Sequence, residues 1–247
     1  MISIKSDREI ELMRKAGKYL SDTFKYIEKY IKTGVTTKKI DELIHDYIIS
    51  IGCVPSCLGY EGYPATSCIS INDEVVHGIP RERKIKNGDI VSIDLVLNYE
   101  GYHADATRTY IVGNVSEEVK NLVQDTKDAF YAGVSVVKAG MRVRDISRAI
   151  ESYAHSHGLC VVEELCGHGI GLEMHEDPDV CNFDDGNKTR LKAGMTIAIE
   201  PMLNLGSKEV YLEDDGWTVR TKDGLPSCHY ENTILVTKDG YEILTGD

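Results

Sequence analysis

The chain has 247 residues, of which 42% are hydrophobic and 28% are charged, and it carries a formal net charge of −12. This apolar content supports a packed core and excludes a chain of disordered type. The acidic balance, without any basic cluster, excludes nonspecific attraction to nucleic acid or to an anionic membrane surface. One large domain or two smaller ones fit this length.

The N-terminus and the cysteine pattern are both typical of the cytoplasm. The first residues lack a charged segment followed by an apolar one, and no apolar run could span a bilayer. We therefore expect a soluble cytoplasmic protein. The seven cysteines include no Cys-x-x-Cys pair, which fits a reducing compartment. Cys53 and Cys57 have no second pair of zinc ligands at a suitable spacing, so we interpret them as free thiols.

Apolar residues at helical spacing predict four amphipathic helices, arranged as two pairs. The first pair covers Ser6 to Ile31 and Thr37 to Ile51, and the second covers Ser116 to Lys138 and Val143 to His157. The first helix begins with Ser6 and Glu9 at the spacing of a capping box. Each short helix is followed by a glycine, a usual residue at a helix C-terminus.

The two helix pairs belong to a repeat with an offset of 106 residues. Residues 31–35 match 137–141, and residues 86–94 match 192–200, which aligns Asp94 with Glu200. Two matches at one offset indicate a duplicated helix-helix-strand unit.

We therefore predict an α+β fold in which two such halves, at about 6–113 and 116–236, share one sheet within a single domain over 1–247. The aligned acids Asp94 and Glu200 are then expected to face each other across a pseudo-twofold axis.

Residues 90–98 and 102–112 are predicted to form two antiparallel strands of a hairpin. The tight turn between them can be placed in two registers. One register puts Asp94 directly opposite Asp105, and the other puts the two carboxylates diagonally on the same face. Either register brings the two acids together.

Three acidic residues lie in or beside strands that otherwise have the composition of a core. Asp94 lies within an apolar run, Glu200 interrupts a second one, and Glu231 precedes a third. Burying carboxylates without compensation is costly, and two of them side by side would force one to keep its proton. A divalent cation removes both problems. This favours a metal site over the alternative that Asp105 is a solvated strand residue.

Three histidines lie in settings that suit a site. His168 lies in the glycine-rich segment 166–171, where glycines let the backbone approach closely. Phosphate binding is the alternative for such a segment, but no Gly-Lys-Ser or Gly-Lys-Thr follows it. His175 follows seven residues later, and His77 stands in an apolar segment of the first half.

Two further histidines, His103 and His229, lie close in sequence to proposed ligands. We expect them to support those ligands or to face solvent.

Four motifs now stand together, and they resemble those of type I methionine aminopeptidases over almost the whole length of the chain. They are Asp94 with Asp105 eleven residues later, CGHGIG at 166–171 with MHEDP at 174–178, IEPM at 199–202, and HYENTI at 229–234. The resemblance implies the pita-bread fold, in which two pseudo-symmetric halves surround a curved antiparallel sheet. It also implies one catalytic domain.

The resemblance further implies a site for two divalent metal ions. By this matching Asp94 binds one metal, Asp105 and Glu231 bridge both, and His168 and Glu200 complete the other. Four carboxylates neutralise two dications. Oxygen-rich ligation with one imidazole suits Mn²⁺, Fe²⁺ or Co²⁺ better than a closed Zn²⁺ site.

Catalytic roles follow from the same matching. Two metals can provide a water nucleophile at neutral pH and polarise the scissile carbonyl. His175 resembles the histidine that hydrogen-bonds the carbonyl oxygen, and His77 resembles the one that reaches the scissile amide nitrogen or the residue beyond it. Glu200 resembles the residue that carries a proton from water to the leaving amine. The substrate α-amine would bind the metal in the Asp94 half, as an exopeptidase requires.

A pocket for the methionine side chain is also implied. Its lining is expected to be Cys57, Tyr60, Tyr63, Cys68 and Trp217, where sulfur meets aromatic faces. The family often has an aromatic residue before the second motif histidine, whereas this chain has Met174 there. Family substrates carry a small second residue, so this chain, with Ile2, is expected to keep its own Met1.

The implied substrates are N-terminal methionyl peptides and nascent chains, with the ribosome as a further partner and a monomer as the working form. Two alternatives remain. An Xaa-Pro aminopeptidase or dipeptidase shares the five-ligand set, but usually has an extra N-terminal domain for which this chain has no room before its first repeat. A nonenzymatic pita-bread protein that binds peptides or ribosomes would be expected to lose ligands, and none is missing.

Overall fold

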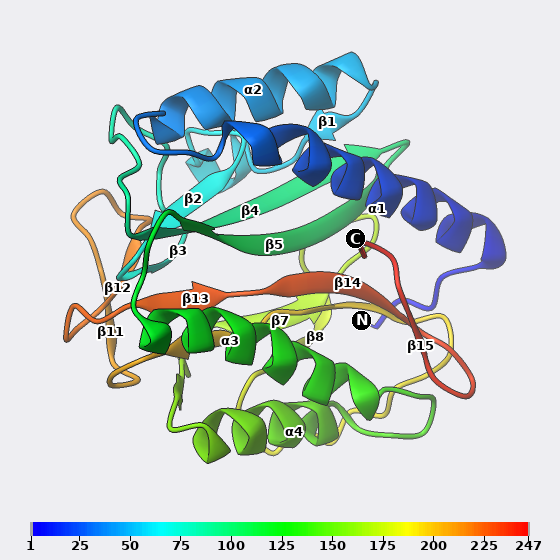
Figure 1. Ribbon diagram of the computed structural model, residues 1–247. Helices are drawn as coiled ribbons and strands as arrows, with labels where there is room; N and C mark the ends of the chain where they lie inside the picture. Colours follow the sequence, from blue (N-terminus) through cyan, green and yellow to red (C-terminus); the bar gives the residue numbers. More distant parts are fainter. Residues whose placement is uncertain (1, 247) are drawn as a thin grey trace.

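A computed structural model describes residues 2–246 as four α-helices around a strongly twisted, mostly antiparallel sheet (Figure 1). The helices are α1 (Asp7–Ile27), α2 (Thr37–Ser50), α3 (Glu117–Ser135) and α4 (Val143–Ser156). None of these described helices is long and apolar enough to cross a membrane.

The predicted starts of the helices are confirmed, but two predicted ends are wrong. Ser6 caps α1 in the predicted capping box, in which its backbone N–H donates to the Glu9 carboxylate over 2.7 Å. Instead of continuing to Ile31, the helix tightens into a 3₁₀ turn at Glu28–Tyr30, after which the chain turns at residues 33–34. Backbone bonds of residues 34–37 to the segment 83–85 draw the chain away from the helix axis. The third helix likewise ends at Ser135, three residues early.

Nine strands form the main sheet, in the order β1-β4-β5-β14-β9-β7-β8, with β2 paired to β4 and β15 paired to β14. Two smaller sheets, β13-β10-β6 and β11-β12-β3, flank it. The strands are β1 (Val54–Pro55), β2 (Cys68–Ile71), β3 (Glu74–Val76), β4 (Asp89–Tyr99), β5 (Tyr102–Val112), β6 (Cys160–Val161), β7 (Cys166–Gly169), β8 (Glu176–Cys181), β9 (Thr196–Ile199), β10 (Met202–Asn204), β11 (Val210–Leu212), β12 (Val219–Thr221), β13 (Ser227–His229), β14 (Glu231–Val236) and β15 (Tyr241–Ile243).

The hairpin of β4 and β5 takes the second of its two possible registers. Glu100 and Gly101 form the turn, both with positive φ, as a two-residue turn that matches the strand twist requires. Asp94 therefore lies opposite Thr107, and Asp105 lies opposite Val96. The two carboxylates are diagonal neighbours on the same face of the sheet.

The offset of 106 residues recurs in the backbone. The bounds of α2 and α4 differ by 106, and the isolated bridge between Thr36 and Lys84 has its counterpart between Arg142 and Arg190. Gly34, Gly52 and Gly88 have positive φ, and so do the glycines 106 residues later. Because other residues are strained at positive φ, these glycines hold the same turns in both halves. The assignment of 1–247 to one domain with two halves stays a prediction.

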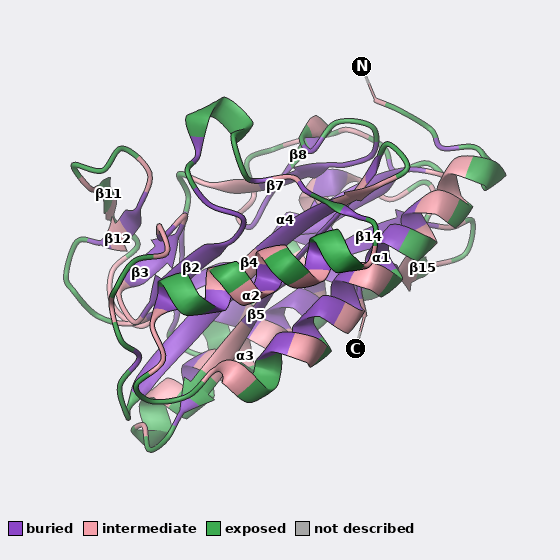
Figure 2. Ribbon diagram, turned by 90° about the horizontal axis from the view of Figure 1, so that it is seen from above, coloured by how far each residue is buried: buried purple, intermediate pink, exposed green. Residues whose placement is uncertain are grey.

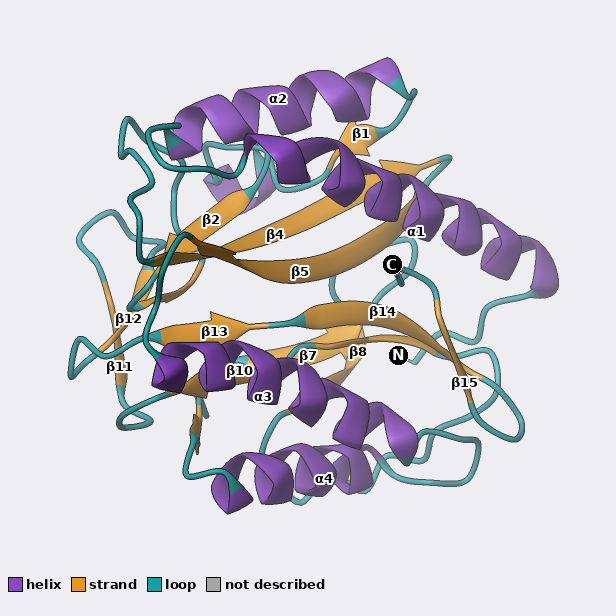
Figure 3. Ribbon diagram, viewed as in Figure 1, coloured by secondary structure: helices purple, strands orange, loops and turns teal. Residues whose placement is uncertain are grey.

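The helix pairs cover separate parts of the sheet (Figure 3). Helices α1 and α2 pack with β2, β4 and β5 around one apolar core, and α3 and α4 pack with β9, β10 and β13 around another. The strands beneath the helices are buried, while the outer helix faces are exposed (Figure 2). The two regions meet where β14 pairs with β5, with Glu231 opposite Thr107.

One disulfide was not predicted. Cys166 on β7 and Cys181 on β8 lie directly opposite each other, with 4.3 Å between their Cα atoms, and they are bonded. The expectations drawn from the cysteine pattern did not include this bond. Cys53 and Cys57 are buried and free. Spacing could not reveal the pair because only the strand register brings the two residues together.

Candidate metal centre and active site

The five proposed ligands come from five separate strands or strand ends and line one cavity of about 270 Å³. Asp94 and Asp105 project from the β4–β5 hairpin, His168 from β7, and Glu231 from the start of β14, while Glu200 follows β9. The cavity lies where the two regions of the sheet meet. These are the five residues expected to be ligands from the sequence, and their role as ligands stays a prediction.

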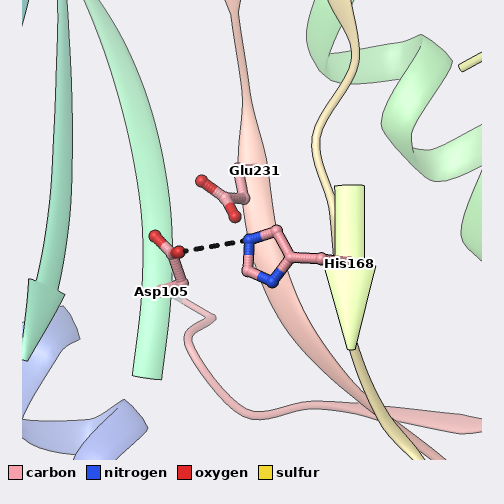
Figure 4. Close-up of side chains that lie close together, drawn as sticks. All are labelled: Asp105, His168 and Glu231. Atoms are coloured by element: carbon pink, nitrogen blue, oxygen red, sulfur yellow. Dashed lines mark ion pairs between the residues drawn. The ribbon is translucent and has the colours of Figure 1, made fainter. Parts of the chain in front are cut away.

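Two overlapping groups of side chains could each hold a cation. Asp105, His168 and Glu231 point toward one another from β5, β7 and β14 (Figure 4), and their ligand atoms lie within 4.8 Å of one another. His168 Nε2 is 3.7 Å from Asp105 Oδ2 and 3.6 Å from Glu200 Oε1. The second group consists of Glu200, His229 and Glu231, again with atoms within 4.8 Å.

Burial makes this cluster unfavourable for charged acids. The pKa values of Asp105, Glu200 and Glu231 are raised well above their usual range, first by burial and then by the neighbouring carboxylates. Burial also raises the pKa of Asp94. The pKa of His168 falls to about 4, mainly through burial, so its imidazole is neutral and can act as a ligand.

The residues fit a divalent cation. Asp94 Oδ1, Asp105 Oδ1 and Glu231 Oε1 are buried without a hydrogen-bond partner among residues 2–246. Buried polar atoms normally have partners, and leaving one unpaired is costly. A cation would satisfy these oxygens and would remove the repulsion that raises their pKa values. The donor set of carboxylate oxygens and imidazole matches the preferences of first-row dications.

Contacts behind the ligands fix their orientation. Thr107 Oγ1 donates to Glu231 Oε2 over 3.0 Å, and Thr233 exchanges two hydrogen bonds with the backbone of Asp105. Arg108 lies on the other face of β5 and donates to the Glu231 carbonyl over 2.7 Å. The acids are thus held by their backbones and by one hydroxyl, which leaves their remaining oxygens free for a metal.

The glycines around His168 explain its position. Gly169 O lies 2.9 Å from His168 Nδ1, so Nδ1 carries the proton and Nε2 faces the carboxylates. A Cβ at Gly167 would come within 2.4 Å of the Ala198 carbonyl oxygen on β9. Only glycine allows this approach of β7 to its neighbour, as the sequence predicted for this segment.

The two other motif histidines lie at the cavity. His175 is exposed at its mouth, where its ring centroid is 4.3 Å from that of His168 and its Nδ1 is 2.8 Å from Tyr60 Oη. His77 follows β3 with φ of 58° and lines the cavity. Burial lowers the pKa of His77 to about 4. Burial also lowers the pKa of His175, so both side chains are neutral hydrogen-bonding groups beside the cluster at neutral pH.

An apolar pocket adjoins the cluster. Cys57, Tyr63, Cys68 and Met174 are buried together with Trp217 packed against them, and the rings of Tyr63 and Trp217 meet edge to face at 5.1 Å. Met174 thus forms a wall of this pocket. Tyr60 is not in this cluster but stands at the rim, through its contact with His175. The roles of these residues stay predictions.

Sequence reasoning underestimated His229. It does not face solvent, because only 2% of its surface is exposed, and it lines the cavity beside Glu200. Alternate residues of a strand share a face, so its place two residues before Glu231 could have indicated this. The same rule selects His103, two residues before Asp105, but that side chain contacts the Gly171 carbonyl and is not among the residues that line the cavity.

Known proteins share this architecture. The model of metallopeptidase family M24 matches residues 11–238. A methionine aminopeptidase of Clostridium perfringens is 46% identical over 246 residues, which is 99% of each chain. The crystal structure of methionine aminopeptidase from Rickettsia prowazekii has a TM-score of 0.98 and 42% identity over 100% of both chains. An Xaa-Pro dipeptidase of Bacillus anthracis is more distant, with a TM-score of 0.80 and 26% identity over 99% of this chain and 62% of its own. These likenesses confirm the predicted pita-bread fold and the resemblance to methionine aminopeptidases, and the chain belongs to metallopeptidase family M24.

Proposed function

We propose that this chain is a metal-dependent methionyl aminopeptidase that removes the N-terminal methionine from peptides and nascent proteins. The observation that carries the proposal is the convergence of four carboxylates, two buried and two partly buried, and a neutral imidazole beside an apolar pocket lined by thiols and aromatic rings. The full-length similarity to methionine aminopeptidases supports it.

Two divalent cations are proposed as cofactors, with Mn²⁺, Fe²⁺ or Co²⁺ favoured over Zn²⁺ because carboxylate oxygens dominate the donor set. The residues that would hold them are Asp94, Asp105, His168, Glu200 and Glu231. When bound, such a pair supplies a water nucleophile at neutral pH and polarises a carbonyl.

Three side chains are proposed to act on the substrate. Glu200, whose pKa burial raises, suits a residue that takes a proton from water and passes it to the leaving amine. Tyr60 Oη can donate to His175 Nδ1, which leaves the proton on Nε2 available for the carbonyl oxygen of the scissile bond. His77, which also lines the cavity, is proposed to bond the scissile amide nitrogen or the residue beyond it.

The role of His175 can be measured. His175→Ala should lower kcat by roughly 10²- to 10³-fold, because it removes a hydrogen-bond donor to the developing negative charge. Steady-state kinetics on a methionyl tripeptide would check this, with His103→Ala as the matched control because His103 is not among the residues that line the cavity. A change confined to KM would contradict the role.

The pocket of Cys57, Tyr63, Cys68, Met174 and Trp217 is proposed to hold the methionine side chain, with Tyr60 at its rim. Sulfur packs favourably against aromatic rings, which suits a thioether substrate. We further propose a small second residue in the substrate, so that Ile2 leaves the chain's own Met1 in place. The proposed setting is a cytoplasmic monomer acting on nascent chains, with the ribosome as the corresponding docking partner.

A substrate comparison tests the function. The purified protein should release methionine from Met-Ala-Ser and should lose this activity with a chelator. It should leave an Xaa-Pro peptide intact. Cleavage of the Xaa-Pro peptide instead would favour a dipeptidase or Xaa-Pro aminopeptidase, and chelator-insensitive binding without hydrolysis of either peptide would favour a nonenzymatic protein.

A further inference from the structure

A second imidazole reaches the metal cluster from a position outside the five-ligand set. His229 is the last residue of β13, and only 2% of its surface is exposed. Its Nε2 atom is buried and has no hydrogen-bond partner among residues 2–246. A buried ring nitrogen without a partner is costly, so its position requires a reason.

The geometry around Glu200 is the same on both sides. His168 Nε2 is 3.6 Å from Glu200 Oε1, and His229 Nε2 is 3.6 Å from Glu200 Oε2. The Glu200 carboxylate therefore lies between two imidazoles. Because His168 is a proposed ligand at this separation, the separation alone gives no reason to exclude His229.

The second group of convergent atoms includes this histidine. Glu200, His229 and Glu231 offer atoms within 4.8 Å of one another, just as Asp105, His168 and Glu231 do. Of the described residues that line the cavity, none is Lys or Arg, so no basic side chain there competes for these acids.

The backbone holds His229 in this place. Met202 on β10 pairs with it, and Thr109 Oγ1 donates to its carbonyl oxygen over 2.7 Å. The strand thus aims the side chain at the cluster, and its Nε2 atom has no hydrogen-bond partner among residues 2–246. A ligand held this way needs little rearrangement on binding.

We propose that His229 is an additional protein ligand of the metal centre, binding through Nε2 a cation that Glu200 and Glu231 also contact. The inference rests on the proposed function only in that it takes this cluster to be a metal centre. It gives the centre two imidazoles, one on each side of Glu200. An added nitrogen ligand increases affinity for borderline dications such as Co²⁺ relative to Mn²⁺.

The test uses the metal-free full chain and Co²⁺ alone as the probe. Isothermal titration calorimetry gives the affinity, and X-ray absorption at the cobalt edge reports the number of imidazoles bound. The wild type should show two imidazoles per cobalt pair. His229→Ala and the better-packed His229→Gln should show one, with one binding step weakened at least about 10- to 100-fold. His103→Ala is the control and should match the wild type.

Thermal unfolding of the metal-free variants separates ligation from folding. His229→Gln should unfold cooperatively near the wild-type temperature, so that a lost imidazole reports ligation. If a folded His229→Gln binds Co²⁺ with wild-type affinity and an unchanged imidazole count, the proposal is overturned. Failure of the proposed function appears differently, as a protein that binds Co²⁺ through two imidazoles but does not release methionine.

Discussion

Glu74 and the acids of the metal cluster differ in the source of the positive charge that compensates them. Glu74 is buried at the start of β3, and its Oε1 accepts from Arg81, Arg83 and Arg220, while its Oε2 accepts from a backbone N–H over 2.7 Å. The acids of the metal cluster have no such partners. None of the described residues lining their cavity is Lys or Arg, and several of their oxygens are unpaired.

This difference distinguishes a cluster of structural ion pairs from a ligand-binding site. Guanidinium groups oppose the rise that burial causes in the pKa of Glu74. In the metal cluster the neighbouring carboxylates add to the effect of burial. A folded chain tolerates the second arrangement only if the positive charge comes from outside, as a bound cation or as protons. The unpaired cluster is therefore the one that binds something.

The Glu74 cluster nevertheless supports the site. Glu74 lies three residues before His77, and Arg220 lies three residues after Trp217. The ion pair between Glu74 and Arg220, at 2.7 Å, joins β3 to β12 and so holds two walls of the cavity together. The charged groups that stabilise the fold thus lie close to those that are proposed to bind the metal.

The largest expected effect comes from Glu200→Ala. Turnover should be abolished, because the change removes both a proposed ligand and a proton carrier. In the metal-free protein the same change should raise the unfolding temperature, since it removes an uncompensated buried acid. Peptide hydrolysis and thermal melting check the two parts. Glu163→Ala is the control, because Glu163 forms an exposed ion pair with Lys208. Near-normal activity with added Mn²⁺ or Co²⁺ would contradict the assignment.

Glu74→Ala should have the opposite effects to Glu200→Ala: it should lower stability and leave metal binding unchanged. It leaves guanidinium groups without their buried partner and should lower the free energy of unfolding by about 3–5 kcal/mol. Metal stoichiometry should be kept, because Glu74 lies outside the cluster. Urea denaturation and metal analysis of the same sample check both statements. A variant as stable as the wild type would show that the ion pairs between Glu74 and the arginines do not stabilise the fold.

The effect of a chelator on stability should depend on pH. Carboxyls with a raised pKa in the folded state contribute stability below their unfolded value of about 4, and this is lost as pH rises through the folded value. Buried histidines with lowered pKa values act in the opposite direction, but only below about pH 6.5.

Above about pH 6.5, where the histidines no longer contribute, a rise in pH toward the raised pKa values of these acids should therefore lower the stability of the metal-free protein relative to the metal-loaded one. Melting temperatures of both forms across this range provide the measurement. A difference in Tm that stays constant or shrinks as pH rises would mean that the acids are not held protonated in the metal-free state.

The smallest expected effect is the loss of stability on replacing Arg81, which can be compared with the loss on replacing Arg220 in the same cluster. The Arg81 side chain is 43% exposed, whereas that of Arg220 is 15% exposed and also pairs with Asp73. Arg81→Ala should cost about 0–1 kcal/mol of stability, as exposed pairs do. Arg220→Ala should cost several times more, because Arg220 is itself less exposed and pairs with three carboxylates, those of Asp73, Glu74 and Glu213. Equal losses in urea denaturation would show that exposure does not control these pairs.

Patterns in the sequence alone determined much of the secondary structure and of the candidate site. The helix starts, the repeat at 106 residues, the hairpin that carries Asp94 and Asp105, and the glycine segment around His168 could all be predicted from the sequence. These features depend on spacing within a few turns or strands, where periodicity and glycine conformation act directly. The motifs also sufficed to indicate the family.

Only the tertiary structure decided the rest. It selected one of two hairpin registers, ended α1 early, joined Cys166 to Cys181, and buried His229 against Glu200. The hairpin register and the disulfide depend on how two strands pair, and the end of α1 depends on backbone bonds to residues 83–85. The place of His229 depends on its contacts with β10 and β5. Pairing and packing of this kind bring residues of different segments together, and local spacing does not encode them.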